Sequence, residues 1–379
     1  MKILQIFSTL HRGNGVIEVL KALISRMSKY ENVEISSYSN RNYDKEIHLL
    51  INNLGANYYY KKNNNFIWSS LEQDVPNIRE YDIVHIHGVF TLKNMYITKK
   101  IKELGIPYII TLHGNLMEEA LKKSKIKKYI ARKLIVDWAL NNAEAIHVLA
   151  MEEKRSLEKI VDNKKVILIP NGLNMKNYKC ITKNNIVPNT FRILYLGRLD
   201  VIHKGLDLLI DSILLNPTFF RENNVKVDLV GNYSSKRDKR YFDNKIKNSP
   251  ELNDILVFHG PKYEEDKYEF FQKGDIFIHT SRYEGMPIAV LEAMSYGLPC
   301  LVTIGSNMSD IINKSNSGIV SEFNKEEIFK ALTKLVSMTK QELEKMGESG
   351  RLFLEENLSW NDIVDQYINE YNRILFHND

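Results

Sequence analysis

Short continuous apolar runs alternate with longer stretches of helical spacing in the first half of the chain. The first run is residues 3–7, and behind it apolar residues recur at three- and four-residue steps up to residue 27. Further runs follow at residues 83–88, 108–114, 145–149 and 166–169. Continuous runs rich in β-branched residues are typical of strands covered on both faces. Strands that alternate with helices predict a parallel sheet in an α/β fold.

A second series of the same kind follows a polar segment rich in Asn and Lys at residues 173–190, which we predict to be a linker. Its apolar runs are residues 193–197, 227–231, 256–260, 276–279 and 300–302. The pattern therefore predicts two tandem Rossmann-like, doubly wound domains, residues 1–172 and 173–359. Residues 360–376 have helical spacing of their own, through Ile363, Tyr367, Tyr371 and Ile374.

The composition is that of an ordinary globular protein. Of the 379 residues, 44% are hydrophobic and 26% are charged, which excludes a mostly disordered chain or a coiled coil. Cys180 and Cys300 give neither a zinc spacing nor a disulfide framework. The net charge of +5 is too mild to predict nucleic-acid binding. No run of 18 apolar residues occurs, and the N-terminal run is too short for a signal peptide, so we expect a cytoplasmic protein.

The most informative segment is residues 281–294, which follow the predicted strand 276–279. Pro287 suits the first turn of a helix, and Gly285 lets backbone approach a ligand closely. Free N–H groups at that helix start form an anion site. Glu284 and Glu292 flank it, and carboxylates accept strong hydrogen bonds from the hydroxyl groups of a hydroxyl-rich ligand. For either glutamate alone, a favourable acidic turn is an equally good interpretation.

Residues 197–205 follow another predicted strand and open the next helix. Arg198 offers a planar fork and Lys204 a point charge, and both suit phosphate oxygens. The alternative is a pair of solvated loop charges. Because both segments follow strands of one predicted sheet, we favour a site that binds a diphosphate without a metal ion. No two aspartates here lie two positions apart, so the chain has no Asp-x-Asp metal-binding motif.

The sequence resembles the retaining glycosyltransferases of glycosyltransferase family 4, which have the GT-B fold. Two glutamates eight positions apart, Glu284 and Glu292, match the family signature, and Arg198 and Lys204 match its Gly-Arg…Lys-Gly segment. The resemblance covers nearly the whole chain. It implies two Rossmann-like domains that face a cleft, with residues 360–379 packing back on the first domain.

The resemblance also implies roles for individual residues. Arg198 and Lys204 would clamp the donor diphosphate, Glu284 would face the donor sugar, and Glu292 would bind the ribose. His113, at the end of the run 108–114, would lie beside the donor sugar. The implied donor-binding residues are Gly13, Asn14, Gly15, Gly197, Gly231, Gly260, Gly285, Met286, Pro287, Ile288 and Glu292.

Two other interpretations of the first domain are weaker. His85 and His87 share one face of a predicted strand and could ligate a metal, but no third ligand is evident. The turn at residues 10–15 is similar to a dinucleotide fingerprint, but Glu18 stands where its third glycine is required. We therefore expect no metal, no cofactor and no dinucleotide-dependent oxidoreductase.

Residues 122–133 carry seven basic residues and no acidic ones. Ile126, Ile130, Leu134 and Trp138 form one helical stripe. One interpretation is a helix that faces the core with a solvated basic side. The other is docking on anionic lipid, where each basic residue contributes about 1 kcal/mol. The basic residues are Lys122, Lys123, Lys125, Lys127, Lys128, Arg132 and Lys133. Those expected to contact the membrane or the acceptor are Lys122, Lys123, Lys125, Lys128 and Arg132.

From the resemblance we expect a retaining glycosyltransferase. It would move a hexose-type sugar from a UDP- or GDP-linked donor to a hydroxyl of a glycan or lipid-linked acceptor. Synthesis of a cell-surface polysaccharide such as a capsule, O-antigen or exopolysaccharide is the expected context. A peripheral location on the inner face of the membrane would suit such an acceptor. The alternatives are a sugar-nucleotide 2-epimerase and a non-catalytic nucleotide-sugar-binding protein of the same fold.

Overall fold

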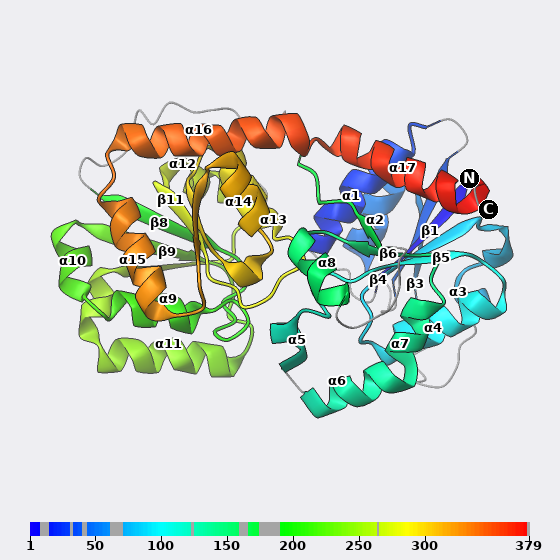
Figure 1. The fold of residues 1–379 in the computed structure, drawn as a ribbon, viewed down its shortest axis with the longest axis horizontal. Coiled ribbons are helices and arrows are strands. Elements are labelled where there is room, and N and C mark those ends of the chain that lie inside the picture. Colours follow the sequence, from blue (N-terminus) through cyan, green and yellow to red (C-terminus); the bar gives the residue numbers. More distant parts are fainter. Residues whose placement is uncertain are drawn as a thin grey trace. The chain divides into compact units, whose positions relative to one another are not determined.

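The computed structural model describes residues 1–7, 15–30, 33–39, 44–60, 71–122, 125–158, 166–173, 190–263 and 265–376. The chain divides into two compact units (Figure 1). Unit 1 contains Met1–Gly172 and Trp360–Asp379, and unit 2 contains Leu173–Ser359. The polar segment predicted as a linker lies almost wholly outside the described residues.

Unit 1 contains a seven-stranded parallel sheet in the order β3-β2-β1-β4-β5-β6-β7. Its strands are β1 Lys2–Phe7, β2 Glu34–Ser39, β3 Asn57–Tyr60, β4 Ile83–His87, β5 Tyr108–Thr111, β6 Ala145–Val148 and β7 Val166–Leu168. Its α-helices are α1 Gly15–Met27, α2 Lys45–Asn53, α3 Leu71–Asp74, α4 Leu92–Glu103, α5 Glu118–Lys122, α6 Lys125–Ala131, α7 Asp137–Asn141, α8 Met151–Glu158 and α17 Trp360–Phe376.

Unit 2 contains a six-stranded parallel sheet in the order β10-β9-β8-β11-β12-β13. Its strands are β8 Phe191–Leu196, β9 Val225–Val230, β10 Leu256–Gly260, β11 Ile276–His279, β12 Cys300–Thr303 and β13 Gly318–Ser321. Its α-helices are α9 Leu206–Ile213, α10 Pro217–Glu222, α11 Lys236–Asn248, α12 Glu265–Lys273, α13 Ile288–Ser295, α14 Ser309–Ser315, α15 Lys325–Val336 and α16 Lys340–Asn357.

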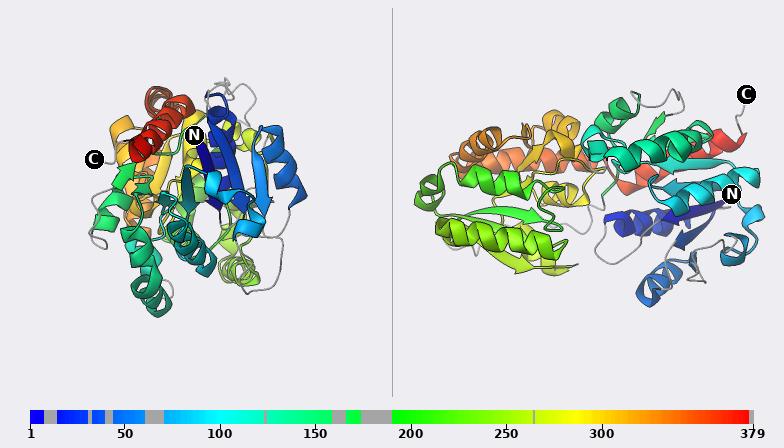
Figure 2. Two further views of the ribbon diagram at one scale, coloured as in Figure 1. Left: turned by 90° about the vertical axis from the view of Figure 1, so that its right-hand side faces the viewer. Right: turned by 90° about the horizontal axis from the view of Figure 1, so that it is seen from below.

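Helices cover both faces of each sheet, as the views from the side and from below show (Figure 2). The inner strands are buried almost throughout, as expected for parallel strands between two helical layers, whereas the edge strands β3, β7, β10 and β13 are mostly half-buried. This confirms the predicted α/β class with two Rossmann-like domains. β2, β3 and β13 were not predicted. β2 was missed because it carries the buried serines Ser36, Ser37 and Ser39 where an apolar run is the usual signal.

The last helix, α17, belongs to unit 1 although unit 2 precedes it in the chain. It packs against α1 and buries Ile363, Tyr367, Tyr371 and Ile374, the stripe that the spacing indicates (Figure 1). At its start Trp360 lies against Gly172, where a Cβ atom would come within 2.8 Å of the indole. A glycine is therefore required where the two chain segments of unit 1 meet.

Each sheet reverses its strand order at one point, between β1 and β4 in unit 1 and between β8 and β11 in unit 2. Open α/β sheets bind ligands outside the carboxyl ends of the strands at such a switch point. In unit 2 the loops after β8 and β11 hold Arg198, Lys204 and Glu284. The topology therefore places the predicted phosphate-binding residues at the favoured edge of this sheet.

Two details of the helices differ from the prediction. α13 begins at Ile288, with Pro287 as the residue just before the first turn. The stripe through Ile126, Ile130 and Leu134 does not face the core: these side chains are 76%, 50% and 70% exposed. The core-facing residues of this region are Val136, Ala139 and Leu140 instead. In the described part of the chain, no helix is long and apolar enough to cross a membrane.

Candidate active site

The loops that follow β8 and β11 are bound to each other at the switch point of unit 2. The backbone N–H of Arg282 donates to the carbonyl of His203 at 3.0 Å, and His203 Nε2 lies 2.9 Å from the carbonyl of Tyr283. The Arg282 guanidinium donates a hydrogen bond to each carboxylate oxygen of Asp207, both at 2.7 Å. These contacts fix the distance between the segment that carries Lys204 and the segment that carries Glu284.

Gly205 is the residue that permits this close approach. Its φ of 62° is left-handed, and a Cβ atom there would lie 2.0 Å from the carbonyl oxygen of Thr280. The Thr280 hydroxyl donates to the carbonyl of Lys204 at 2.9 Å. The β8 loop therefore lies directly on the end of β11.

Lys204 and Glu284 form an ion pair at this edge. Their side chains are only 12% and 14% exposed, so the pair is largely shielded from water. The Ser281 hydroxyl also donates to Glu284 Oε1, at 2.8 Å. The structure thus brings together a cation predicted to bind phosphate and a carboxylate predicted to face the sugar.

Two histidines complete the surroundings of Glu284. His279 Nε2 lies 3.5 Å and His203 Nε2 lies 3.7 Å from Glu284 Oε1. Burial alone would raise the pKa of Glu284, but Lys204 and the two histidines outweigh it and hold that pKa well below its usual range. Burial lowers the pKa of both His279 and His203. At neutral pH the carboxylate is therefore ionised between neutral imidazoles.

Arg198 differs from Lys204 in being exposed. Its backbone carbonyl accepts a hydrogen bond from Tyr195 at 2.8 Å, which anchors the residue in the loop after β8. Among the residues that the structure describes, its guanidinium has no hydrogen-bond or ion-pair partner. A guanidinium in this state can bind an incoming anion without first giving up another contact.

Three predicted glycines stand at the ends of adjacent strands. Gly197 follows β8, Gly231 follows β9, and Gly260 ends β10. A Cβ atom on Gly231 would lie 1.8 Å from the carbonyl oxygen of Gly197, whereas one on Gly260 would have nothing within 4 Å. Gly231 is thus required by backbone packing, and the space beside Gly260 is open.

The segment from Gly285 to Ile288 leads into α13. The Asn307 side chain donates to the carbonyls of Glu284 at 2.6 Å and Gly285 at 2.9 Å, and these hydrogen bonds hold the segment in place. Gly285, Met286 and Pro287 are buried, and the first N–H groups of α13 lack helical partners by geometry. The arrangement suits an anion at the helix start.

Glu292 lies on α13 and is nearly buried, with a side chain 8% exposed. It forms an ion pair with Lys267 of α12 at 2.5 Å. Nothing in the sequence predicts this partner, because Lys267 lies on a different helix with no motif around it. A ligand hydroxyl could bind the carboxylate alongside the ammonium.

In unit 1 His113 follows β5 with a left-handed φ of 51°, which is uncommon for a residue other than glycine. Its Nε2 lies 2.9 Å from His87 Nδ1. The next residue, Gly114, donates its N–H to the buried carboxylate of Glu153, which also accepts from Leu149 at 2.8 Å. Burial raises the pKa of Glu153 to about 7 and lowers the pKa of His113 to about 3.

The other predicted residues of unit 1 are only partly described. Gly15 begins α1 and is exposed, whereas Gly13 and Asn14 lie outside the described residues. Within the described ranges, no group of three or more His, Cys, Asp or Glu side chains could hold a metal ion. His85 and His87 instead form hydrogen bonds to neighbouring side chains.

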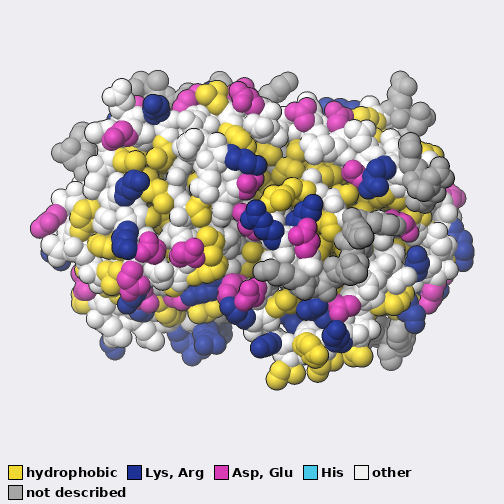
Figure 3. All heavy atoms as spheres, viewed as in Figure 1, with side chains coloured by type: hydrophobic (Ala, Val, Ile, Leu, Met, Phe, Trp, Pro, Cys, Tyr) yellow, Lys and Arg dark blue, Asp and Glu magenta, His cyan; other side chains and the backbone are white. Residues whose placement is uncertain are grey.

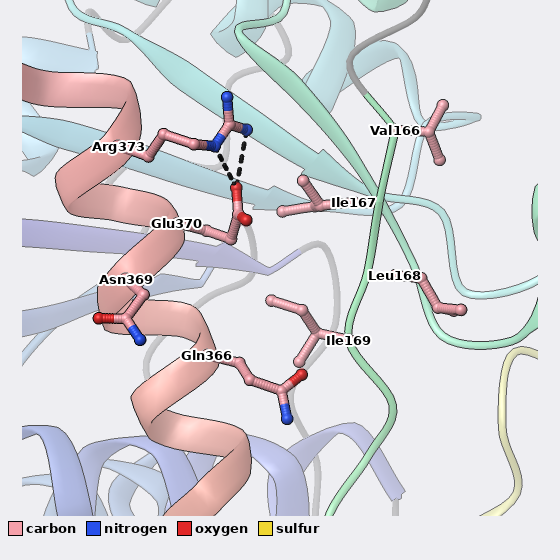
Figure 4. A pocket seen from close by; sticks show the side chains of 8 residues that line it. All are labelled: Val166, Ile167, Leu168, Ile169, Gln366, Asn369, Glu370 and Arg373. Carbon is pink, nitrogen blue, oxygen red and sulfur yellow. Dashed lines mark hydrogen bonds and ion pairs between the residues drawn. The ribbon is translucent and has the colours of Figure 1, made fainter. Parts of the chain in front are cut away.

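A surface pocket of about 490 Å³ lies elsewhere on unit 1, between β7 and α17 (Figure 4). Val166–Ile169 form one wall, and Gln366 and Asn369 project from the other. Glu370 and Arg373 form an ion pair at 2.7 Å at its edge. None of the predicted site residues lines this pocket.

The basic residues of the 122–133 segment fall into two groups. Lys128 donates to the carbonyl of Ala120 at 2.6 Å, Arg132 pairs with Asp137 at 3.3 Å, and Lys122 pairs with Glu119. Lys122 is nevertheless exposed, as are Lys125, Lys127 and Lys133, and Lys123 lies outside the described residues. Hydrophobic side chains gather beside Lys and Arg side chains over α6 at the lower edge of Figure 3.

Solved structures share the whole architecture. Sucrose-phosphate synthase from Thermosynechococcus elongatus has a TM-score of 0.78 at 15% identity, over 100% of both chains. Anabaena Alr3699/HepE in complex with UDP and glucose has a TM-score of 0.75 at 17% identity, over 98% of this chain and 99% of the other. The protein has the fold of these two-domain proteins, the GT-B fold.

Sequence comparisons define the family. Residues 14–177 match Glycosyltransferase Family 4, and residues 177–353 match Glycosyl transferases group 1. The chain belongs to glycosyltransferase family 4.

Two curated relatives extend this comparison. One is the Escherichia coli UDP-Gal:alpha-D-GlcNAc-diphosphoundecaprenol alpha-1,3-galactosyltransferase, 28% identical over 65% of this chain and 63% of that protein, just under two thirds of its length. The other is the Xanthomonas campestris GDP-mannose:cellobiosyl-diphosphopolyprenol alpha-mannosyltransferase, 24% identical over 79% of this chain and 76% of that protein.

Proposed function

We propose that the protein is a retaining, metal-independent glycosyltransferase. It transfers a hexose from a UDP- or GDP-linked donor to a hydroxyl of a lipid-linked glycan during synthesis of a cell-surface polysaccharide. The observation that carries the proposal is the Lys204–Glu284 ion pair beside the exposed Arg198, at the switch point of the unit 2 sheet. No cofactor is required in this scheme.

The two cations act on the leaving group. As the bond from the sugar to the diphosphate breaks, negative charge grows on the phosphate oxygens, and preorganised cations there stabilise the transition state most. Arg198 binds these oxygens with its free fork. Lys204 has three N–H donors, so it can contact a phosphate oxygen while it still holds Glu284. The N-terminus of α13 adds the partial positive charge of its free N–H groups.

The carboxylates bind the uncharged parts of the donor. Glu284 stays ionised because its pKa is low, and it accepts hydrogen bonds from hydroxyls of the sugar. Glu292 accepts from the ribose hydroxyls, and its ion pair with Lys267 orients the carboxylate. In unit 1, His113 contacts the sugar that is transferred.

The acceptor is proposed from the relatives. Both curated relatives act, by their names, on a sugar linked through diphosphate to a polyprenol, although one uses UDP-Gal and the other GDP-mannose. The two relatives therefore share a type of acceptor although their donors differ. An acceptor with a long lipid tail remains in a membrane, so a surface that binds lipid would favour the encounter.

The exposed α6 surface, formed by Ile126, Tyr129, Ile130 and Leu134, suits this task. These four side chains are 50% to 76% exposed. Lys125, Lys127 and Lys133 of the same segment are exposed as well. Figure 3 shows Lys and Arg side chains next to hydrophobic ones over α6. Apolar side chains flanked by lysines bind the boundary between headgroups and acyl chains of an anionic bilayer. We propose that this surface docks on anionic lipid.

Sedimentation with vesicles tests the docking. The protein should sediment with phosphatidylglycerol vesicles but not with phosphatidylcholine vesicles, and added salt should release it. The double variant Ile126→Ser/Leu134→Ser should lose this binding. The control Leu49→Ser/Leu352→Ser, which changes two exposed leucines elsewhere, should keep it. Absence of salt-sensitive binding by the unchanged protein would refute the docking.

A donor panel tests the reaction itself. The protein is incubated with UDP- and GDP-sugars, with a polyprenyl-diphosphate sugar as acceptor and EDTA throughout, and products are identified by mass spectrometry. We expect transfer of one hexose, with the anomeric configuration of the donor retained in the NMR spectrum of the product. A free epimerised sugar would identify a 2-epimerase. Donor binding without any product would identify a non-catalytic binding protein.

A further inference from the structure

A chain of hydrogen bonds crosses the buried interior of unit 1. It begins at the backbone carbonyl of Ile169, which lies 2.8 Å from His147 Nε2. His147 Nδ1 lies 2.7 Å from the hydroxyl of Thr111, and this hydroxyl lies 2.5 Å from His85 Nε2. His147, Thr111 and His85 are completely buried.

The chain of hydrogen bonds continues through a residue of α17 and ends at His113. The Tyr371 hydroxyl lies 2.7 Å from His85 Nδ1 and 3.1 Å from Gln5 Nε2. Gln5 Oε1 lies 2.8 Å from His87 Nε2, and His87 Nδ1 lies 2.9 Å from His113 Nε2. Nothing in the sequence predicts this path, because Tyr371 and His85 lie 286 residues apart.

The carbonyl at the start sets the direction of every bond in the first half. A carbonyl can only accept, so His147 Nε2 carries the proton and His147 Nδ1 accepts from Thr111. The Thr111 oxygen then accepts from His85 Nε2–H. The Tyr367 hydroxyl, 3.4 Å from His147 Nε2, is too distant to compete with the carbonyl at 2.8 Å.

The directions of the hydrogen bonds in the second half follow in the same way. His85 Nδ1 has no proton, so the Tyr371 hydroxyl donates to it and accepts from Gln5 Nε2–H. The amide oxygen of Gln5 then accepts from His87 Nε2–H. His87 Nδ1 is left as an acceptor, and within the described ranges its donor is His113 Nε2–H.

We infer that this chain holds His113 as the neutral tautomer with the proton on Nε2, so that its Nδ1 can only accept a hydrogen bond from a bound molecule. The inference rests on the proposed function, in which His113 contacts the transferred sugar. Tyr371 and Gln5 are positioning residues, since they act on the sugar only through His87 and His113. No partner of His113 Nδ1 is found among the described residues.

The consequence is a rule for the group that His113 binds. An acceptor nitrogen pairs with a hydroxyl and repels a phosphate oxygen, which has no proton to give. Burial lowers the pKa of His113 to about 3 and places the pKa of His87 well below its usual range, so protonation does not reverse this preference near neutral pH. His113 therefore contributes to recognition of a sugar hydroxyl rather than of the diphosphate.

Nitrogen-15 NMR of the histidine-labelled full chain, without substrate, tests the inference. The ring-nitrogen shifts distinguish the two neutral tautomers and the charged form, and His113→Gln assigns the His113 signals by their loss. We expect His85, His87, His113 and His147 to be neutral with the proton on Nε2 from pH 8 to pH 5. A proton on Nδ1 in any of the four, or a charged form within this range, would overturn the inference.

A pair of variants on α17 sharpens the test. Tyr371→Phe removes the hydroxyl that accepts from Gln5 Nε2 in the hydrogen-bond chain, so the amide group can rotate. The ring-nitrogen shifts of His113 should then move towards those of a mixture of tautomers. Tyr367→Phe is the matched control, since its hydroxyl stands outside the chain, and should leave His113 unchanged. Unchanged His113 shifts in Tyr371→Phe would contradict the positioning role.

A second pair covers the case in which Tyr371→Phe does not fold. Thr111→Val cuts the link to the Ile169 carbonyl, and Thr111→Ser preserves the hydroxyl and should restore the unmixed His113 signals. Because these spectra need no substrate, they are separate from the proposed reaction. If the tautomers are as expected but His113→Gln is fully active, then His113 does not contribute to binding the sugar. The hydrogen-bond chain itself would still be supported.

Discussion

The carboxyl ends of the two sheets are built from opposite kinds of interaction. In unit 2 the edge carries ion pairs, with Lys204 on Glu284 and Lys267 on Glu292. In unit 1 a neutral chain of hydrogen bonds runs through the interior and reaches the corresponding edge at His113. Ion pairs can exchange partners with a charged ligand, whereas a neutral chain fixes the direction of each bond. This difference agrees with the proposed function, which assigns charged groups of a ligand to unit 2 and an uncharged hydroxyl to His113.

Breaking the Lys204–Glu284 pair should give the largest change in stability. Lys204→Met leaves a shielded carboxylate without its cation, which costs about 3–5 kcal/mol of the free energy of unfolding of unit 2. The double variant Lys204→Met/Glu284→Gln should recover most of this loss. Hydrogen exchange followed by mass spectrometry measures the two units separately. Equal effects of the single and double variants would mean that the pair is not the stabilising contact.

Acid should weaken unit 1 through its histidines. Burial lowers the pKa of His147 to about 4, against about 6.5 in an unfolded chain, so the unfolded state binds more protons in this window. The contribution is complete above pH 6.5 and is lost as the pH falls to about 4, at a cost of about 3 kcal/mol for this one group. His85, His87 and His113 act in the same direction.

Two other sets of groups enter the same measurement. Glu153, with its pKa raised to about 7, acts in the opposite direction, because its stabilising protonated form is lost as the pH rises from about 4.5 to 7. In unit 2, His203 and His279 also have lowered pKa values. These are two histidines, compared with the four named above in unit 1. Hydrogen exchange at pH 7 and pH 5, corrected for intrinsic rates, should therefore show a larger loss of protection in β4 and β5 than in β8 and β11. Equal losses would contradict the contrast between the units.

A pair of glycine variants tests how the unit 2 edge is assembled. Gly205 and Gly260 have nearly the same left-handed φ, 62° and 66°, but only Gly205 faces a neighbour. Gly260→Ala should cost about 1 kcal/mol of unfolding free energy for backbone strain alone. Gly205→Ala adds a clash with the Thr280 carbonyl and should cost about 2–4 kcal/mol. Equal shifts in denaturant midpoint would show that the β8 loop relaxes away from β11.

The smallest effect is expected at the exposed α6 surface. Ile126→Ser removes a side chain that is 76% exposed, so the free energy of unfolding should change by less than about 0.5 kcal/mol. Denaturant unfolding of this variant measures the change. A loss above about 2 kcal/mol would mean that Ile126 is buried against another part of the chain, and the surface would then not be free for lipid.

The sequence was sufficient for the parts of the site that follow directly from strand order. Lys204 and Glu284 each stand a few residues after a predicted strand, and parallel strands bring such loops to one edge of the sheet. It was insufficient for partners chosen by tertiary packing, such as Lys267 for Glu292 and Tyr371 for His85. These residues carry no local motif, and their contacts join distant helices and strands.

The stripe on α6 shows a different limit of sequence reasoning. Helical periodicity identifies which residues share a face, but it does not reveal whether anything covers that face. Ile126 and Leu134 have the spacing of core residues, and the structure leaves them exposed while Val136 and Leu140 of the same region are buried. Such an exception is a reason to look for a binding role.

The central claim is that the cations after β8 bind the diphosphate of the donor. Isothermal titration and turnover with the best nucleotide sugar, in EDTA, test it in Arg198→Ala, Lys204→Ala and the control Arg237→Ala on the exposed side of α11. We expect the first two each to lose about 2–4 kcal/mol of transition-state stabilisation, roughly 30- to 1,000-fold in kcat/KM, while the control is unchanged. Normal binding and turnover in Arg198→Ala and Lys204→Ala would contradict it.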